Sequence, residues 1–460
     1  MTKRGDRSRA PSARAARPWI RAAAYRRLRA RPMARPWLLG ILSHTLEHRH
    51  TPRRRPLRVL WVTRIFPNRV EPLSCPFQRQ QLASLSRLCD VEVLAAIPYH
   101  PGVSFLGDRT RPGRLNAVPD RDEIDGIAVA HPRAPYLPGA GSLLAPVNAP
   151  LYLAGLLPHV PRLRGRFDVV LGAWLFPDAC AAAVLARMLG LPHAVKGHGT
   201  DVNVVARWRS VRPIVSAALR SAACAIGVSR PMVEALVELG ARPDRAALVP
   251  NGVDRRLFHP GDRGEARRAL GLPERARLVA FVGRLDPLKG VHELLAAFQQ
   301  ITEAPGDEAP PHLVLVGDGP ARGAAEQVAA RPELAGRVLV AGPRTLPEVA
   351  RYVTACDVLA LPSYAEGTPN VVLEALAAAR PVVAAAVGGI PDVVAHGRTG
   401  LLVPPRDVPA LVAALREALA RGWDEGAFVE GAPPSWDESA ARLHQLLARA
   451  AFGPEAELAA

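Results

Sequence analysis

The chain has 460 residues, 49% of them hydrophobic, and a formal net charge of +17 at pH 7. It is long enough for two globular domains with cores of their own, which excludes a wholly disordered protein. Residues 1–56 hold 15 arginines and one lysine against Asp6 and Glu47, so +14 of the charge lies there. We therefore expect residues 1–56 to be a disordered basic extension that can touch anionic lipid or nucleic acid, while the nearly neutral remainder binds no nucleic acid.

The cysteines and the apolar runs indicate the cellular compartment of the protein. The five cysteines are scattered and form no C-x-x-C pair, which predicts a reduced, cytoplasmic environment and no structural zinc. No uninterrupted run of 18 apolar residues occurs, so we predict no membrane-spanning helix. The apolar run 134–160, broken by proline and glycine, is expected either to pack in the core or to lie against a membrane or a lipid-linked acceptor.

Short apolar strands alternate with helices from residue 57 onward. We predict strands at 57–63, 91–95, 127–130, 168–171, 193–195 and 224–228, and helices at 77–88, 178–189 and 231–239. Alternating strands and helices form a parallel sheet with helices on both faces, so residues 57–250 are expected to be one Rossmann-like domain.

A second alternation follows the turn-forming sequence N-G-V-D at residues 251–254. We predict strands at 278–282, 312–316, 338–340, 358–361 and 382–384, and helices at 292–300, 346–354 and 408–421. The fold class is therefore α/β, with two doubly wound, Rossmann-like halves. Ligands of such sheets bind outside the carboxyl ends of the strands, so two facing sheets would leave a cleft between them.

The sequence E-G-T-P-N-V-V-L-E, from Glu366 to Glu374, places a glutamate on either side of a helix start. Thr368 or Asn370 can cap this helix, and Pro369 suits its first turn. The free N–H groups and the positive dipole end of such a helix suit a phosphate or another anion. The two glutamates are thus candidates to bind opposite ends of one ligand; a solvated acidic loop before an ordinary helix is the alternative.

Two cations follow the first strand of the second half, in the sequence G-R-L-D-P-L-K that starts at Gly283. The glycine lets the chain turn, and Arg284 and Lys289 extend from the end of the strand, where they can neutralise a diphosphate. A surface turn with two solvated cations is the alternative. With the two glutamates of the same half, these cations are what a nucleoside diphosphate sugar needs: cations for the phosphates, Glu374 for the ribose and Glu366 for the sugar.

These motifs resemble family four of the retaining glycosyltransferases, the group 1 enzymes of the GT-B fold. The resemblance rests on the E-x7-E motif, P-V-V-A at 381–384, G-G-I-P-D-V-V at 388–394, G-R-L at 283–285, K-G at 289–290 and P-N-G-V-D at 250–254. W-L-F-P-D at 174–178 and G-T-D-V-N at 199–203 resemble the branch that includes teichuronic-acid and exopolysaccharide transferases. The resemblance covers roughly residues 57–450, and nothing in residues 1–56 takes part in it.

The resemblance implies a domain organisation. Residues 57–250 would form the acceptor-side domain, residues 251–430 the domain that binds the nucleotide sugar, and residues 431–460 a closing helix that returns to the first domain. The two domains would face each other across a cleft.

The resemblance also implies roles for single residues. Arg284 and Lys289 would contact the donor diphosphate, Glu374 the ribose and Glu366 the transferred sugar. Backbone amides close to the sugar or phosphate would come from the loop formed by Gly367, Thr368, Pro369 and Asn370. The anomeric configuration would be retained, with the leaving phosphate taking the proton of the acceptor, so that electrostatic stabilisation by the two cations sets the rate and no metal is required.

Three polar residues of the first half have open roles. His198 faces the cleft if the halves oppose each other; in enzymes that the sequence resembles, a histidine near this place contacts the donor sugar, and otherwise it holds its loop. Asp201 is a candidate on the acceptor side or the cap of the following helix, and Asp178 is expected to cap the helix that follows it. Asp120 and Asp122 imitate a metal-binding D-x-D, but we expect a charged loop there with no strand.

One segment departs from the family pattern. Where the family has a glycine-containing loop after the first strand, this chain has Cys75 followed by Pro76. The side chain of Cys75 and the missing N–H of Pro76 put the phosphate contact of that loop in doubt and leave the acceptor side open. Arg79 is either a compensating cation or a solvated helix residue.

The function we predict is transfer of a hexosyl or other glycosyl group from a UDP- or GDP-linked sugar to a saccharide or lipid-linked acceptor, in cell-surface glycan or exopolysaccharide synthesis. The expected cofactor is none beyond this nucleotide-sugar substrate. The expected location is the cytoplasm, with peripheral association at the inner face of the membrane.

Two alternatives stay open. A sugar phosphorylase or a sugar-phosphate synthase would share the fold and differ in its acceptor. Extra cations in the first half would favour it, and the sequence shows no obvious cluster of them there beyond Arg64 and Arg69. A non-enzymatic membrane or nucleic-acid binder with a basic tail is supported only by residues 1–56, since the body lacks a basic stripe with interleaved aromatics.

Overall fold

The computed structural model describes residues 55–100, 102, 107–137, 141–303 and 310–454. Apart from its last two positions, the basic extension predicted over 1–56 lies outside the described residues. Arg55–Ala460 form one compact unit that contains two large sheets and a small two-stranded one.

The first half is built around an eight-stranded sheet with the strand order β10-β9-β8-β7-β1-β2-β5-β4, and β3 and β6 pair separately. All neighbours in the large sheet are parallel except β4 and β5. The elements are β1 (Arg58–Thr63), α1 (Pro76–Leu85), β2 (Asp90–Ala95), β3 (Ile97–Tyr99), α2 (Arg111–Leu115), β4 (Arg121–Ile124), β5 (Ile127–Ala130), β6 (Arg133–Pro135), α3 (Gly141–Leu144), η2 (Ala145–Val147), α4 (Asn148–Leu156), η3 (Leu157–His159), α5 (Val160–Leu163), β7 (Val169–Ala173), η4 (Leu175–Ala179), α6 (Cys180–Leu189), β8 (His193–Lys196), α7 (Thr200–Asn203), η5 (Val205–Arg207), α8 (Arg212–Ser221), β9 (Cys224–Gly227), α9 (Arg230–Glu238), η6 (Pro243–Arg245) and β10 (Ala246–Leu248).

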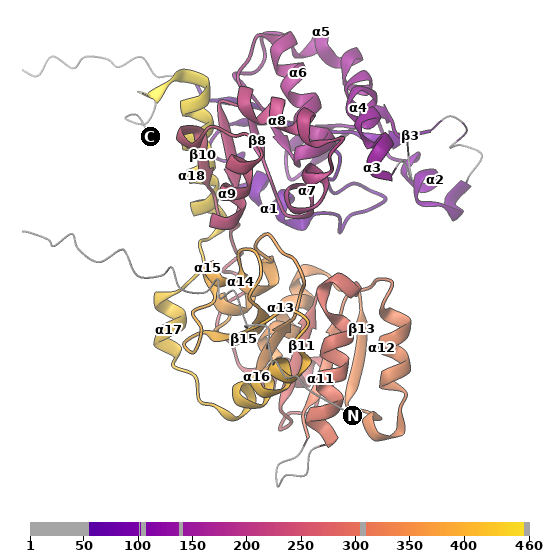
Figure 1. The fold of residues 1–460 in the computed structure, drawn as a ribbon, viewed down its shortest axis with the longest axis vertical. Helices are drawn as coiled ribbons and strands as arrows, with labels where there is room; N and C mark the ends of the chain where they lie inside the picture. The colour runs from indigo at the N-terminus through magenta and orange to yellow at the C-terminus, as the bar shows by residue number, and fades with distance from the viewer. Residues whose placement is uncertain (1–54, 101, 103–106, 138–140, 304–309, 455–460) are drawn as a thin grey trace, which may run out of the picture. The chain divides into compact units, whose positions relative to one another are not determined.

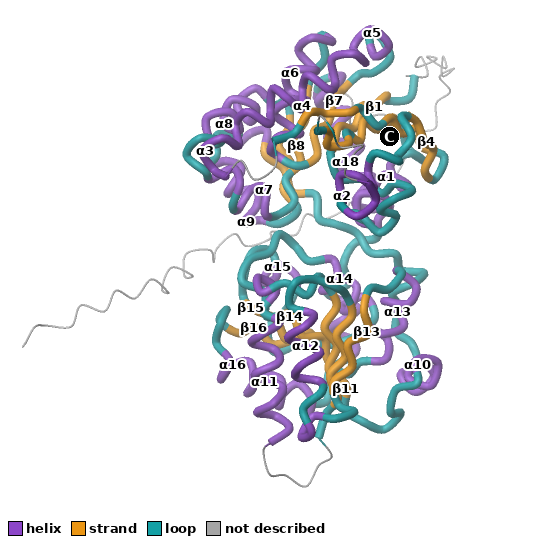
Figure 2. The backbone as a smooth tube through the Cα atoms, turned by 90° about the vertical axis from the view of Figure 1, so that its right-hand side faces the viewer, coloured by secondary structure: helices purple, strands orange, loops and turns teal. Residues whose placement is uncertain are grey.

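The second half contains a six-stranded, fully parallel sheet with the order β13-β12-β11-β14-β15-β16, and helices lie on both of its faces (Figure 2). The elements are α10 (Arg263–Leu270), β11 (Leu278–Val282), η7 (Pro287–Lys289), α11 (Val291–Glu303), β12 (His312–Val316), α12 (Arg322–Ala329), η8 (Pro332–Leu334), β13 (Val338–Gly342), α13 (Leu346–Ala355), β14 (Val358–Leu361), α14 (Asn370–Ala377), β15 (Val382–Ala385), α15 (Ile390–Val393), β16 (Gly400–Val403), α16 (Val408–Ala420) and α17 (Glu425–Glu430). The last helix of the chain is α18 (Trp436–Phe452).

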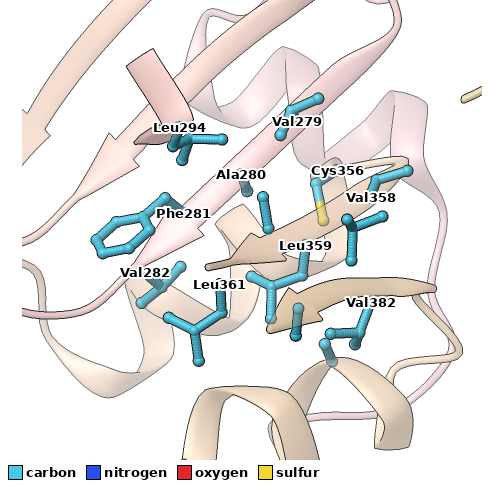
Figure 3. Close-up of a cluster of buried hydrophobic side chains, with 14 of the residues drawn as sticks. Val279, Ala280, Phe281, Val282, Leu294, Cys356, Val358, Leu359, Leu361 and Val382 are labelled. Atoms are coloured by element: carbon cyan, nitrogen blue, oxygen red, sulfur yellow. The ribbon is translucent and has the colours of Figure 1, made fainter. Parts of the chain in front are cut away.

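The predicted strands are confirmed, each within two residues of its expected bounds. They are apolar on both faces because helices cover the parallel sheets on both sides, so their sequences are nearly continuous hydrophobic runs. Figure 3 shows this core in the second half, where side chains of β11, β14 and β15 interdigitate with Leu294 of α11. The strands that were not predicted, β3, β4, β6, β10 and β16, are short and carry alanine, proline, glycine or charge.

Helix α18 belongs to the core of the first half although it ends the chain. Its yellow ribbon lies among elements of the first sheet in Figure 1, and it packs on α1, β7, β8 and β9. Its Ala440, Leu443 and Leu447 are buried in the same hydrophobic cluster as Trp61 of β1. The connection back to the first half is therefore fixed by apolar packing.

The apolar segment before β7 packs only partly into the core, with 39% of its most apolar stretch buried. Gly141–Leu163 is, by length and composition, the one described stretch that could cross a membrane, with 23 residues and a mean hydropathy of 1.3. It is broken into short helical pieces, and Tyr152, Leu156 and Leu163 are buried against the first sheet. Leu143, by contrast, is 81% exposed.

Three local expectations were wrong. Asp122 lies in a strand, β4, and not in a loop; its carboxylate accepts two hydrogen bonds from Arg69, which lowers its pKa. Asp178 does not cap α6, because it is fully buried and accepts a hydrogen bond from the backbone N–H of Arg64. Helix α14 has no side-chain cap either, and Pro369 occupies its N-cap position.

Candidate active site

Each of the two large sheets has one switch point, where the order of the strands along the chain reverses direction. In the second sheet the chain starts at β11, runs outward to β13, and returns to β14 on the other side of β11. In the first sheet the corresponding neighbours are β1 and β7. Because loops leave such adjacent parallel strands in opposite directions, a crevice for ligands opens at their carboxyl ends. The predicted site residues follow these strands.

A cavity of about 600 Å³ is lined by both halves, which is the size of an ordinary small-molecule site. From the first half its lining includes residues that follow β1, β7 and β8, namely Leu73, Pro76, Phe77, Gln80, Trp174, His198, Gly199, Thr200, Asn203 and Val204. From the second half it includes Gly283, Arg284, Asp286, Lys289, Arg344, Glu366, Gly367, Thr368, Pro369, Asn370 and Glu374. The cations and carboxylates predicted to bind one ligand thus share one cavity.

An ion pair joins the two loops of the second switch point. The Lys289 ammonium lies 2.6 Å from the Glu366 carboxylate, whose side chain is only 8% exposed. The approach requires glycine at position 290, which has a left-handed φ of 71°. A Cβ there would lie 2.1 Å from the Pro362 carbonyl oxygen. The loop after β11 therefore packs directly on the loop after β14, and the side chains of Lys289 and Glu366 face each other.

Of the two cations, Arg284 is the more exposed to solvent. Its side chain is 69% exposed, and its Nε lies 3.3 Å from an oxygen of Asp286. The other oxygen of Asp286 accepts a hydrogen bond from the backbone N–H of Leu288 and so fixes the turn that carries Lys289. Since an exposed ion pair is worth about 1 kcal/mol or less, Arg284 can reorient toward a phosphate at little cost.

The start of α14 forms the next part of the wall. The Thr368 hydroxyl donates to the Val228 carbonyl, 3.1 Å away, and the Asn370 side chain accepts from the Asn251 amide at 2.8 Å. Thr368 thus ties α14 to the first half and Asn370 ties it to the connection between the halves, and neither side chain caps the helix. The N–H groups of the first turn are therefore left without a side-chain partner, next to the cavity.

Glu374 lies one turn further along α14 and lines the same cavity. Burial raises the pKa of its carboxyl to about 8. At pH 7 this carboxyl is protonated, so it can both donate and accept a hydrogen bond, which suits a neutral partner such as a ribose hydroxyl.

The two halves touch at Gly367 and His198. A Cβ on residue 367 would lie 2.2 Å from the His198 carbonyl oxygen, so only glycine fits. Asn203 of α7 adds a hydrogen bond of 3.3 Å to the Glu366 carbonyl. The loop that carries Glu366 is thus positioned by the first half as well as by its own sheet.

His198 sits in an aromatic cluster. Its ring centroid lies 4.8 Å from that of Trp174 and 5.2 Å from that of Phe77. Neither ring nitrogen has a hydrogen-bond partner, and burial together with the charge of Lys196 holds its pKa well below the usual value. His198 is consequently neutral at pH 7, with two unused nitrogen atoms at the edge of the cavity.

Asp201 positions this loop and does not line the cavity. Its buried carboxylate accepts hydrogen bonds from the backbone N–H groups of His198, Gly199 and Leu175. The acceptor-side role of Asp201 stays a prediction, whereas the simple cap is wrong, because Gly199 occupies the N-cap position of α7. A single carboxylate instead binds the loops after β7 and β8 together.

Cys75 has the backbone conformation of a glycine. Its φ of 46° and ψ of 56° are left-handed, at the N-cap of α1, with Pro76 as the first helical residue. Cysteine adopts this conformation at a cost of roughly 1–2 kcal/mol. Pro76 lines the cavity, whereas Arg79 pairs with Asp125 and lies outside the lining. Arg79 is therefore not a compensating cation in the cavity.

Sequence reasoning missed Phe77, Trp174 and Arg344, which line the cavity. Trp174 stood in a segment that pointed to the family, but no role followed from it. Its place directly after β7, at the switch point of the first sheet, was the available signal. Arg344 follows β13 in the same manner.

No group of three or more His, Cys, Asp or Glu side chains that could hold a metal ion occurs in the described part of the chain. Asp120 and Asp122 form separate ion pairs, with Arg133 and Arg69.

Comparison with known proteins defines the class. Residues 276–421 match the family model described as glycosyl transferases group 1, and residues 77–252 match the model described as glycosyl transferase 4-like domain. The chain belongs to the group 1 glycosyltransferases and has their GT-B fold, with two Rossmann-like halves.

Individual relatives agree. The chain is 29% identical to the putative teichuronic acid biosynthesis glycosyltransferase TuaC of Bacillus subtilis, over 78% of this chain and 88% of the relative. It is 34% identical to a D-inositol 3-phosphate glycosyltransferase of Geodermatophilus obscurus, over 64% of this chain and 69% of the relative.

Two solved structures share the fold. Sucrose-phosphate synthase from Thermosynechococcus elongatus aligns with a TM-score of 0.66 at 22% identity, over 85% of this chain and 98% of that one. Anabaena Alr3699/HepE in complex with UDP-glucose aligns with a TM-score of 0.58 at 19% identity, over 87% and 98%.

The raised pKa of Glu374 predicts a pH-dependent effect on stability. The folded protein keeps a proton on Glu374 up to about pH 8, whereas the unfolded chain loses it near the ordinary carboxyl pKa, so this group makes the fold less stable as the pH rises between these values. Glu374→Gln removes that cost. Relative to the parent, the variant should gain free energy of unfolding in urea titrations as the pH is raised from 5 to 8.

The exposed Glu333→Gln serves as the control and should show no such trend. A difference between Glu374→Gln and the parent that stays constant with pH would contradict a buried, protonated Glu374.

Proposed function

We propose that this glycosyltransferase moves a sugar from a nucleoside diphosphate donor, with retention of anomeric configuration, to a saccharide or lipid-linked acceptor in cell-surface glycan synthesis. One observation carries the proposal: Arg284 and Lys289 share a cavity with Glu366, Glu374 and the uncapped start of α14. This set offers cations for two phosphates and carboxyl groups for the hydroxyls on either side of them.

The relatives support the donor class. HepE binds UDP and UDP-glucose, and the name of TuaC places that enzyme in teichuronic acid synthesis. The proposed donor is accordingly UDP- or GDP-linked.

The proposed reaction rests on electrostatics. When the diphosphate arrives, it competes with Glu366 for Lys289, and Arg284 turns from Asp286 to the second phosphate. Glu366 is then released toward the sugar. As the bond to the anomeric carbon breaks, the two cations stabilise the charge that develops on the leaving diphosphate. A phosphate oxygen accepts the proton of the acceptor hydroxyl, so neither a strong protein base nor a metal is needed in this scheme.

Loss of either cation should abolish most nucleotide affinity. In calorimetric titrations with UDP and GDP, Arg284→Ala and Lys289→Ala should each weaken binding at least tenfold, or about 1.4 kcal/mol. Arg322→Ala is the matched control, because Arg322 is an exposed arginine of the same half that pairs with Glu326 outside the cavity lining. Unchanged affinity in both cavity variants would contradict the diphosphate assignment.

Glu366 should matter for turnover more than for nucleotide binding. Glu366→Gln keeps the shape of the side chain but frees Lys289, so UDP or GDP affinity should stay equal or rise while kcat for transfer falls at least tenfold. The control is Glu326→Gln, the exposed partner of Arg322.

NMR of the product formed by the parent enzyme should show the anomeric configuration of the donor. An inverted product would refute the proposed mechanism, and an active Glu366→Gln enzyme would refute the role of Glu366 on the sugar.

We also propose cytoplasmic action with peripheral binding to the inner face of the membrane. The exposed Leu143, Leu144 and Val147 lie together on the segment before α4, and exposed leucines of this kind insert into the boundary between headgroups and acyl chains. The free, mostly buried thiols of all five cysteines fit a reducing compartment.

Zwitterionic phosphatidylcholine vesicles test this surface, because they attract the basic N-terminal residues little. The double variant Leu143→Glu and Leu144→Glu should reduce co-sedimentation severalfold. Val429→Glu, at an equally exposed apolar residue of the second half, should not. Equal sedimentation of all three proteins would rule the surface out.

A further inference from the structure

The wall that the first half contributes to the cavity is aromatic and apolar. Phe77 and Trp174 lie with ring centroids 6.3 Å apart and planes tilted by 58°. Leu73, Pro76 and Val204 continue this surface, and the amides of Gln80 and Asn203 stand beside it. A sugar ring has a face of C–H groups and a rim of hydroxyls, so it suits a surface of rings flanked by a few hydrogen-bonding groups.

The aromatic cluster of Phe77, Trp174 and His198 contains polar atoms that have no hydrogen-bond partner. The indole N–H of Trp174 is buried without a hydrogen-bond partner, and the same is true of both ring nitrogens of His198. A buried donor left unpaired costs about 1–3 kcal/mol. Hydroxyl groups of a bound saccharide can satisfy such atoms, so the cluster favours a polar ligand.

Positive charge is missing from this wall. All three cations that line the cavity, Arg284, Lys289 and Arg344, belong to the second half, and the described lining residues of the first half carry no Arg or Lys. A phosphate on the acceptor would need at least one such partner at its own end of the cavity.

The nearby cations of the first half are already paired. Arg64 lies 3.3 Å from the buried carboxylate of Asp178, and Arg69 lies 3.1 Å from Asp122. Lys196 is fully buried and donates to the Gln81 side chain. None of the three lines the cavity, so the two arginines that could have favoured a sugar-phosphate acceptor do not serve one.

We infer that the acceptor presents an uncharged sugar unit that stacks on Phe77 and Trp174, and that sugar phosphates and free phosphate are not acceptors. The inference rests on the proposed function. A hydroxyl oxygen of this sugar forms the new bond to the anomeric carbon of the donor, whose bond to the diphosphate oxygen breaks. The bonding electron pair leaves with the nucleoside diphosphate, and the hydroxyl proton passes to it.

Matched acceptor pairs test the inference on the full-length chain. The panel contains glucose, galactose, N-acetylglucosamine and myo-inositol, each with its monophosphate, together with neutral alkyl glycosides and inorganic phosphate. UDP-glucose, UDP-galactose, UDP-N-acetylglucosamine and GDP-mannose serve as donors, and the readout is nucleotide release above donor hydrolysis. Neutral members should stimulate release at least tenfold more than their phosphorylated partners.

Variants of the wall separate stacking from hydrogen bonding. Trp174→Ala should raise the acceptor KM at least tenfold, while Trp174→Phe, which keeps a ring and loses only the N–H, should raise it less. The UDP or GDP dissociation constant should change less than twofold in both. Trp423→Ala, at a tryptophan outside the cavity lining, is the control.

The outcomes distinguish this inference from the proposed function. If the protein binds neither UDP nor GDP, the proposed function itself is wrong. Suppose instead that the protein binds nucleotide, but that a sugar phosphate or free phosphate stimulates nucleotide release most, or that no neutral acceptor stimulates it. That result would overturn only the inference. An unchanged acceptor KM in Trp174→Ala would also overturn it.

Discussion

The ion pair between Lys289 and Glu366 is the interaction on which the rest of the site depends. It spans the switch point of the second sheet and joins the loops after β11 and β14, with the Lys289 ammonium 2.6 Å from the Glu366 carboxylate. A nearly buried carboxylate is tolerated there only because the ammonium compensates it, since an unpaired buried charge is costly. In the proposed reaction a diphosphate replaces the carboxylate on Lys289, and the displaced Glu366 then becomes available to hydroxyl groups.

Each half constrains the other through this loop. In the loop of residues 366–370, Asn203 donates to the Glu366 carbonyl and the Thr368 hydroxyl donates to the Val228 carbonyl. Gly367 packs closely against the His198 carbonyl. The result is a cavity with two unlike walls, one charged and one aromatic. In the proposed reaction the charged wall binds the nucleotide sugar and the aromatic wall binds the acceptor sugar, which brings donor and acceptor together at the point of transfer.

The sequence predicted the charged wall well and the aromatic wall poorly, for physical reasons. Arg284, Lys289 and Glu366 lie in the loops that follow apolar strands, and Glu374 lies one turn into the next helix; parallel topology brings such positions together. Helix caps at Thr368, Asp178 and Asp201 were wrong: Thr368 and Asp178 take partners from distant segments, and Asp201 binds the backbone of its own loop and of Leu175. Only the tertiary fold brings Phe77 and Trp174, which lie far apart in the chain, beside His198.

A crystal structure of the full-length protein with bound UDP or GDP is the most direct measurement of the central claim. The account predicts diphosphate oxygens within hydrogen-bonding distance of both Arg284 and Lys289, with Glu366 no longer paired to the ammonium and turned toward the place of the sugar. A nucleotide whose phosphates avoid both cations while the Lys289–Glu366 pair stays intact would contradict it.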